Sequence, residues 1–320
     1  MNPHPDGLIL LNKPPGMTSF DALRDIKRIL GTGKVGHTGT LDKFAEGLLL
    51  VLTGRALKLS QWFTHCDKQY EGTICFGTET ETLDPEGAII ANAPIPSRED
   101  VEKAISQFLG AIEQAPPVYS AIHINGERAS TLARRNEAPE MQKRPVTIFR
   151  LELLSWKPPY AKIFVHCSSG TYIRSLARDI ALAAGSRAHL TALIRTQVAG
   201  FKLAGNREQG TGNRGCCSEY SGTSKLYPDF SNHNSPLPTP YSLLPLDKEV
   251  FNCLGIPCLD VVPPDVTKII QGKPLAQILK DVPVPAGENT ATALFSEGKF
   301  IAMIERQDNK WSYGYVYARD

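Results

Sequence analysis

The amino-acid sequence predicts an α+β fold, in which a central mixed or antiparallel sheet is flanked by helices and followed by a small β-rich domain. Strand-like and helix-like patterns both occur along the chain, but without the regular strand–helix alternation of a doubly wound fold. The 320 residues are 42% hydrophobic and 21% charged, a composition typical of a globular protein. This length is sufficient for about two domains with buried cores.

The first half of the chain alternates between strand and helix signals. Apolar residues that recur every three or four positions indicate helices, and apolar residues that alternate with polar ones indicate strands. Ser97, with Asp100 three residues later, resembles a capping box and predicts a helix that ends at Gly110. The other expected elements are a strand at 7–11, a helix capped by Thr18 or Ser19 and ending at Gly31, a buried strand at 48–52, a helix at 56–63 and an alternating strand at 70–76.

The second half of the chain contains a strongly patterned pair of elements and then a change in composition. An alternating strand at 162–167 turns at 168–170, and an apolar stripe after Thr171 predicts a helix. Residues 205–240 are rich in Gly, Ser, Asn and Pro, so we expect a mobile surface insertion there. Beyond this insertion, short apolar runs and a hairpin turn at Glu297-Gly298 predict β structure.

The composition argues against several kinds of protein. The seven cysteines are odd in number and include no Cys-x-x-Cys pair, which disfavours a disulfide framework and a zinc site. The longest apolar run, 48–52, is much shorter than the roughly 20 residues of a membrane-spanning helix. Because no basic segment precedes an apolar one at the N-terminus, no signal peptide is expected. We therefore expect a cytoplasmic protein that binds neither a metal nor a membrane.

The net charge of +2 says little about partners, but basic residues gather in two segments. Residues 160–200 contain five basic residues and one acid, and residues 121–150 contain six basic residues and three acids. Such a local surplus could form a phosphate-binding face. Ordinary solvated helix faces would give the same composition, so charge alone leaves both interpretations open.

One carboxylate stands out in the segment GHTGTLDKFAEGLLL at 36–50. Asp42 lies between glycines and an apolar run, so it is either an ordinary turn residue or an acid held at the edge of a cleft. Arg174, in the first turn of a predicted helix, is a suitable partner, and a guanidinium beside Asp42 would lower the pKa of that carboxylate. A paired-carboxylate hydrolase would need a second acid, but only Glu46 lies nearby in sequence.

Five segments together resemble the TruB family of tRNA pseudouridine synthases. Residues 36–49 follow the pattern G-H-T-G-T-L-D-x-x-A-x-G-L-L. The resemblance covers residues 8–201, and beyond about residue 240 the chain resembles the small PUA-like domain of bacterial members. The four supporting segments are LNKPPGMTS at 11–19, KQY at 68–70, PPVYSA at 116–121 and CSSGTYIR at 167–174.

This resemblance implies that the protein isomerises uridine 55 in the T-loop of tRNA to pseudouridine. The reaction breaks the C1′–N1 glycosidic bond, rotates the uracil and rejoins it through C5, so it needs no cofactor and no metal. Because a stacked base is out of reach of an active site, the uridine has to be flipped out. The implied partner is the T-arm of tRNA, without a guide RNA, and the protein is expected to be a monomer.

The resemblance also implies roles for individual residues. Asp42 matches the essential aspartate, which either attacks the sugar or stabilises and deprotonates a glycal-type intermediate. Tyr70 matches a tyrosine that stacks on the base and is suited to help remove the C5 proton, and Arg174 matches the arginine that pairs with the aspartate. The implied substrate-binding residues are His37, which fills the space of the flipped base, Lys13 beside the uracil pocket, and Tyr172 and Leu193 in its lining.

The expected domains follow from the same comparison of motifs. They are a pseudouridine synthase domain at 1–204 with a thumb-like RNA-binding insertion at 119–146, a low-complexity insertion at 205–240 and a PUA-like domain at 241–320. The thumb-like segment favours a stand-alone enzyme. The alternatives are a guide-RNA-dependent relative and a non-catalytic tRNA-binding or tRNA-folding protein.

Three positions depart from the family pattern. Lys43-Phe44 replaces the common Pro-Leu after the aspartate, Ile194 interrupts a frequent Leu-Arg-Arg run, and His123 stands where a lysine is frequent.

Overall fold

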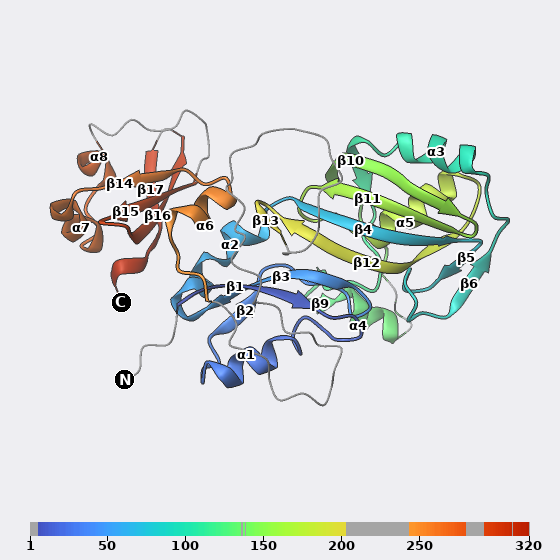
Figure 1. Cartoon of the computed structure of the whole chain (residues 1–320), viewed down its shortest axis with the longest axis horizontal. Helices are drawn as coiled ribbons and strands as arrows, with labels where there is room; N and C mark the ends of the chain where they lie inside the picture. The colour runs from blue at the N-terminus through green and yellow to red at the C-terminus, as the bar shows by residue number, and fades with distance from the viewer. Residues whose placement is uncertain are drawn as a thin grey trace.

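The computed structural model of the protein describes residues 6–135, 137, 139–202, 243–279, 291–308 and 310–319. Within these residues, a nine-stranded sheet forms the N-terminal part and a separate four-stranded sheet forms the C-terminal part (Figure 1). The predicted α+β class, with a β-rich C-terminal part, is therefore confirmed. The predicted insertion at 205–240 lies outside the described residues.

The large sheet is mixed, as the sequence predicts. Its strands follow the order β1-β3-β12-β4-β11-β10-β7, with β2 added beside β3 and β13 beside β12. The pairing of β3 with β12 is parallel, and all the other pairings in this sheet are antiparallel. The strands are β1 (Gly7–Lys13), β2 (Val35–His37), β3 (Glu46–Thr53), β4 (Lys68–Phe76), β7 (Gly110–Gln114), β10 (Arg144–Lys157), β11 (Tyr160–Cys167), β12 (Ala188–Val198) and β13 (Phe201–Lys202).

Helices α3 (Arg98–Ser106) and α5 (Ile173–Ala183) cover one face of this sheet (Figure 1). Side chains of β4 alternate between buried and half-buried positions because successive residues of a strand point to opposite faces. The buried set packs with the apolar stripes of α3 and α5 into one core. This packing fixes the start of α5 above the edge of the sheet.

Strand β3 explains the unbroken apolar run in the sequence. Leu49 and Val51 pack against α1 (Leu23–Ile29) in one cluster. Leu48, Leu50 and Leu52 point to the opposite face and belong to a second cluster, which includes residues of the C-terminal part. A strand that is covered on both faces has no solvated side, so positions 48–52 are all apolar.

Several predicted boundaries are wrong by a few residues. The first helix begins at Leu23, a few residues after the two expected caps. The Thr18 hydroxyl accepts from the Asp21 N–H at 3.1 Å in the turn before α1, whereas the Ser19 hydroxyl is bonded to the backbone of Leu41. The capping box at Ser97 is confirmed, although α3 ends at Ser106 and Gly110 starts β7. The predicted helix at 56–63 is a 3₁₀ helix, Gly54–Leu59, followed by α2 (Ser60–Thr64).

The C-terminal part contains a four-stranded sheet with the order β14-β15-β16-β17. The predicted hairpin is confirmed, because β15 and β16 are joined at Glu297 and Gly298, which have φ values of 49° and 74°. Three helices accompany this sheet. The elements are α6 (Lys248–Cys253), β14 (Cys258–Asp260), α7 (Pro263–Ile270), α8 (Leu275–Ile278), β15 (Ala291–Ser296), β16 (Lys299–Gln307) and β17 (Lys310–Val316).

The two parts share a hydrophobic core. The ring centroids of Phe251 on α6 and Phe300 lie 4.6 Å apart, with the rings tilted against each other. The Phe251 ring also contacts Phe295 edge-on, with a centroid distance of 5.7 Å. These rings pack in the same cluster as Leu50 of β3 and Phe63 of α2. The C-terminal part is therefore held against the large sheet.

Two small hairpins form two-stranded sheets of their own, separate from the hydrogen-bonded ladder of the large sheet. One consists of β5 (Thr78–Thr80) and β6 (Ile89–Asn92), and the other of β8 (His123–Ile124) and β9 (Glu127–Arg128), with α4 (Ala129–Arg134) after it. Across the part of the chain that the structure covers, none of the helices combines the length and apolarity of a membrane span.

Replacing Phe251 by alanine should destabilise both parts together, because the ring is 1% exposed and packs at their junction. We expect a loss of about 3–5 kcal/mol in the free energy of unfolding, as for other buried phenylalanines. Chemical denaturation measures this loss. Phe20, which is 69% exposed, provides the control, since its replacement by alanine should change stability by at most about 0.5–1 kcal/mol. Equal losses in the two variants would contradict the shared core.

Candidate active site

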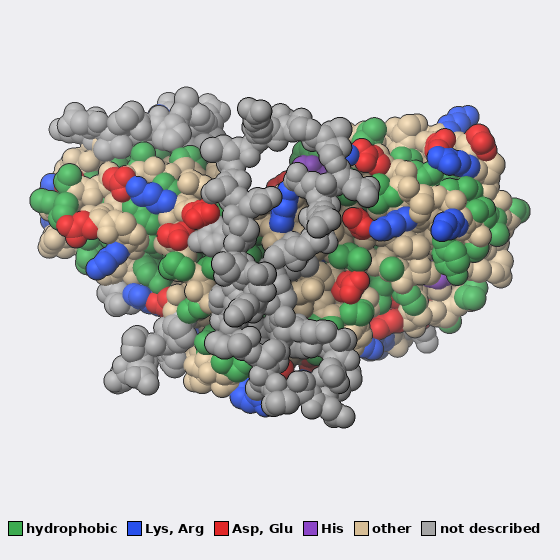
Figure 2. All heavy atoms as spheres, in the orientation of Figure 1, with side chains coloured by type: hydrophobic (Ala, Val, Ile, Leu, Met, Phe, Trp, Pro, Cys, Tyr) green, Lys and Arg blue, Asp and Glu red, His purple; other side chains and the backbone are tan. Residues whose placement is uncertain are grey.

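A cavity of about 650 Å³ lies beside the edge of the large sheet. It is lined by the loop after β2, the turn after β5, the segment with α4, the start of α5 and residues of β4 and β12. Where Figure 2 shows the described residues, basic and acidic side chains are interspersed on the surface. The described residues contain no group of three or more potential metal ligands.

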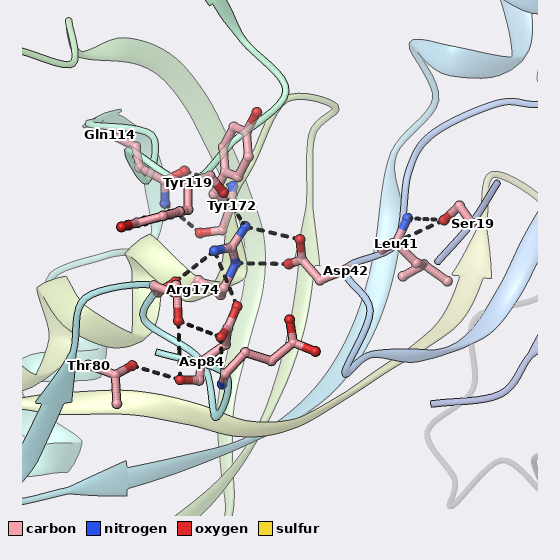
Figure 3. Close-up of polar contacts among 11 residues, drawn as sticks. Ser19, Leu41, Asp42, Thr80, Asp84, Gln114, Tyr119, Tyr172 and Arg174 are labelled. Atoms are coloured by element: carbon pink, nitrogen blue, oxygen red, sulfur yellow. Dashed lines mark hydrogen bonds and ion pairs between the residues drawn. The ribbon is translucent and has the colours of Figure 1, made fainter. Parts of the chain in front are cut away.

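Asp42 reaches the cavity from a loop that is fixed at both ends. The Ser19 hydroxyl accepts a hydrogen bond from the Leu41 N–H at 2.9 Å and donates one to the Leu41 carbonyl at 3.0 Å (Figure 3). On the other side, the Ala45 N–H donates to the Asp42 carbonyl at 3.2 Å. The carboxylate lines the cavity and is 34% exposed.

Arg174 meets this carboxylate with two hydrogen bonds. Its Nε donates to Oδ2 of Asp42 at 2.8 Å, and its Nη2 donates to Oδ1 at 3.0 Å (Figure 3). Two parallel bonds of this kind fix the plane of the carboxylate as well as its position. The guanidinium is only 4% exposed. The structure thus brings together the two residues that the sequence analysis singled out.

The remaining nitrogens of Arg174 bind other segments of the chain. Nη1 donates to the Thr82 carbonyl at 2.7 Å, and Nη2 donates to the Tyr119 carbonyl at 3.1 Å. Nη1 also lies 3.4 Å from Oδ2 of Asp84. One guanidinium therefore joins the Asp42 loop, the turn after β5, the segment before β8 and the start of α5.

Asp84 is the second acid that the sequence analysis did not find. It is 6% exposed, and its Oδ1 accepts hydrogen bonds from the Thr82 hydroxyl at 2.5 Å and the Glu86 N–H at 3.0 Å. Glu46, the nearest acid in sequence, does not line the cavity. The only sequence signal for Asp84 is the Asp-Pro-Glu-Gly turn, which resembles many surface turns.

Three further residues implied by the sequence line the same cavity. Tyr70 lies on β4, Leu193 on β12 and Tyr172 at the N-cap of α5. The side-chain amide of Gln114 holds the backbone of Tyr172, accepting from its N–H at 2.8 Å and donating to its carbonyl at 3.1 Å. Burial raises the pKa of both tyrosines, so their hydroxyls are protonated at neutral pH.

Lys13 and His37 do not line the cavity. Lys13 is fully buried, and its Nζ donates to the carbonyls of Pro14 at 2.9 Å and Met17 at 2.7 Å. Burial lowers the pKa of Lys13 to about 8. His37 is half-buried on β2, and burial lowers its pKa as well. In the described structure Lys13 thus braces the turn near the Asp42 loop.

Comparison with known proteins identifies the family. A model of the "TruB family pseudouridylate synthase (N terminal domain)" matches residues 27–173. A protein of Borreliella burgdorferi, named "tRNA pseudouridine synthase B", is 44% identical over 201 residues, which cover 62% of this chain and 71% of the relative. Its namesake in Bordetella avium is 48% identical over 202 residues, which cover 62% of this chain and 83% of that protein. The chain belongs to the TruB family.

Solved structures resemble the TruB-family chain over nearly its whole length. The structure of an "H/ACA RNP bound to a substrate RNA containing 2'-deoxyuridine" matches with a TM-score of 0.62 at 21% identity, covering 97% of this chain and 82% of the other. The "Cbf5-Nop10-Gar1 Complex" matches with a TM-score of 0.60 at 21% identity and the same coverages. At this identity the comparison supports the fold.

Two cations in this TruB-family cavity were not singled out as site residues from the sequence. Arg195 of β12 is 1% exposed, and its guanidinium donates to the carbonyls of Leu48 at 2.7 Å and Gly39 at 3.1 Å. Lys68 is 8% exposed and donates to the carbonyls of Thr64 and Cys66. Within the described residues neither cation forms a salt bridge with an acid, so both leave positive charge at the cavity wall.

Gly47 lies against the backbone of Arg195. A Cβ atom at Gly47 would come within 2.4 Å of the Arg195 carbonyl oxygen, and the glycine has a φ of +106°. Glycine is therefore the only residue type that fits without strain or displacement of β12.

The electrostatics of Asp42 differ from the sequence-based expectation. Burial raises the pKa of Asp42 more than the charge and the hydrogen bonds of Arg174 lower it, and the nearby Asp84 raises it further. The net pKa is raised, whereas the sequence analysis expected it to be lowered. Burial was the missing factor, because it depends on residues that are distant in sequence.

Arg174→Lys should raise the pKa of Asp42 further, because an ammonium cannot form the paired hydrogen bonds while burial remains. Protonation of Asp42 would then extend to higher pH than in the wild type. A ¹³C NMR titration of the aspartate carboxyls measures this change, with Asp42→Asn to assign the signal. Arg178→Lys is the control, since Arg178 pairs with Asp179. If the pKa of Asp42 were unchanged in Arg174→Lys, the hydrogen bonds of Arg174 would not be what lowers the pKa of this carboxyl.

Proposed function

We propose that this protein is a tRNA pseudouridine synthase that isomerises uridine 55 of the T-loop. The observation that carries the proposal is the Asp42 carboxylate, held at a cavity by two hydrogen bonds from a buried guanidinium. Relatives that are 44–48% identical carry the name of this enzyme. The reaction rearranges bonds within one nucleotide, so its atoms balance without a cofactor.

Asp42 is the group that acts on the sugar. In one route its carboxylate attacks C1′, and the uracil leaves through N1, rotates and returns through C5 to displace the aspartate. In the other route the carboxylate removes the C2′ proton as N1 departs, which gives a glycal. C5 of the rotated uracil then adds to C1′ while the carboxylic acid of Asp42 returns the proton to C2′. Both routes end with the loss of the C5 proton and the gain of a proton at N1. Arg174 serves both routes, since its paired bonds orient the carboxylate and favour its ionised form.

The aromatic and apolar lining suits a flipped uracil. Tyr70, Tyr172 and Leu193 lie on the cavity together with Asp42. A base that leaves its stack loses a few kcal/mol, which an aromatic ring can partly offset by stacking. Because burial keeps the hydroxyl of Tyr70 protonated, we assign it stacking as its first role. Removal of the C5 proton by this hydroxyl would first require the loss of its own proton.

The charges on the cavity suit an RNA substrate. Six basic side chains and three acidic ones line it. Arg128 and Arg134 belong to the thumb-like segment, are exposed and face this cavity, where they can meet backbone phosphates. We extend the proposal to binding of the tRNA T-arm by a cytoplasmic monomer, with a PUA-like C-terminal domain at 241–320 and without a guide RNA.

A T-arm stem-loop transcript, incubated with the protein alone, should acquire pseudouridine at the T-loop uridine, detected by base-specific chemical labelling. Asp42→Asn should reduce the rate by at least about a thousandfold, because the nucleophile or base is removed, while RNA binding persists. Asp25→Asn, at an exposed ion pair on α1, should be as active as the wild type. Product formation by Asp42→Asn at the wild-type rate would refute the role of Asp42, and a requirement for guide RNA would favour the guide-dependent alternative.

A further inference from the structure

An exposed ion pair crosses the rim of the cavity. Nζ of Lys43 lies 3.2 Å from Oε1 of Glu86, and the two side chains are 53% and 45% exposed. Both residues line the cavity, one directly after Asp42 and the other in the turn that contains Asp84. The pair therefore links the two acidic loops that meet at Arg174.

The backbones of both partners are fixed, although their side chains are exposed. The Lys43 carbonyl accepts from the Gly16 N–H at 2.8 Å. The Glu86 N–H donates to the Asp84 carboxylate at 3.0 Å. Consequently only the side chains of Lys43 and Glu86 need to move for the ion pair to open. The backbones of the two residues stay next to Asp42 and Asp84.

An exposed pair of this kind adds little to stability, because water stabilises the two separate charges nearly as well as the ion pair does. A phosphate can therefore compete with Glu86 for Lys43 without unfolding any element. The other cations next to Asp42 differ in this respect. The guanidinium of Arg174 is committed to Asp42, while the guanidinium of Arg195 and the ammonium of Lys68 are buried against carbonyls. Arg128 and Arg134 are exposed on the cavity, but they belong to the thumb-like segment. Lys43 is the cation next to Asp42 whose acid partner can be exchanged.

A flipped nucleotide would bring phosphates to this rim. Its base and sugar would occupy the cavity beside Asp42, so the backbone on either side of the sugar would remain at the entrance. Glu86 would repel such a phosphate, whereas Lys43 would attract it.

We propose that Lys43 binds a backbone phosphate of the substrate RNA at the cavity rim, and that Glu86 holds Lys43 in the free protein until the phosphate replaces it. This inference rests on the proposed function, because it takes RNA as the substrate.

The test compares Lys43→Gln with Glu86→Gln in the full-length protein, using equilibrium binding of the T-arm stem-loop over a range of salt concentrations. Lys43→Gln should weaken binding about fivefold at low salt and reduce the slope of log K against log salt by about 0.7, the value for one contact to a single-stranded phosphate. Glu86→Gln should tighten binding about two- to fivefold, because it removes a competitor for Lys43.

The sign of the Glu86→Gln effect decides between the proposal and a purely structural pair. If the pair only held the two loops together, both variants would weaken binding, and that result would overturn the proposal. Arg98→Gln and Glu102→Gln provide the matched control, because they break an exposed pair of similar geometry on α3 and should leave binding unchanged. Pseudouridine formation by the wild type is measured in parallel, so a failure of the proposed function is recognised separately from a failure of this inference.

Discussion

The site depends on the buried guanidinium of Arg174. Its nitrogens contact a carboxylate on the Asp42 loop, the carbonyls of Thr82 and Tyr119, and the acid Asp84. These partners come from segments that are far apart in the sequence and that do not pair as strands with one another. A buried charge is tolerated only when its donors are satisfied, so the requirement to satisfy this one cation also determines how the loops around the cavity are arranged.

The need to satisfy the buried guanidinium of Arg174 also explains why the cavity wall carries many charges that do not cancel. Asp42 and Asp84 surround one arginine, and burial keeps the pKa of Asp42 above its ordinary value. Arg195 and Lys68 lie on the same cavity and are satisfied by carbonyl oxygens instead of acids. Their uncompensated charge favours an anionic substrate and, through Arg195, lowers the pKa of Tyr70 against the larger effect of burial. Under the proposed function, binding and chemistry would share this small group of charged side chains.

Local patterns in the sequence were enough to predict most of the elements that carry the site. The alternation in β4, the stripe in α5 and the capping box of α3 are each visible within about ten residues, because burial on one face leaves a periodic trace. Of the two residues expected to cap the first helix, Thr18 bonds the N–H of Asp21 in the preceding turn, whereas Ser19 serves a tertiary contact. Its hydroxyl binds the backbone of Leu41, 22 positions away, and no local rule distinguishes this use from capping.

The composition of the site was less predictable than its elements. Asp42 and Arg174 are 132 positions apart, so spacing alone could not pair them and the family resemblance had to supply the link. The same resemblance placed Lys13 beside the uracil pocket and assigned His37 to the space left by the flipped base. Neither residue lines the cavity of the described structure, and both roles stay predictions. Asp84 was missed because a short acidic turn is common on protein surfaces. The raised pKa of Asp42 followed from burial, a property of the packed chain.

Strand β3 has a consequence for how the protein can be divided. Because Leu48, Leu50 and Leu52 pack in the cluster that includes Phe251 and Phe295, one core of the pseudouridine synthase part is completed by C-terminal residues, whereas the core beneath α3 and α5 is not. A fragment that stopped after β13 would expose those leucines to water as a continuous apolar surface, and it would tend to self-associate. Evolutionary loss of the C-terminal part would thus have to be accompanied by polar replacements along one side of this strand.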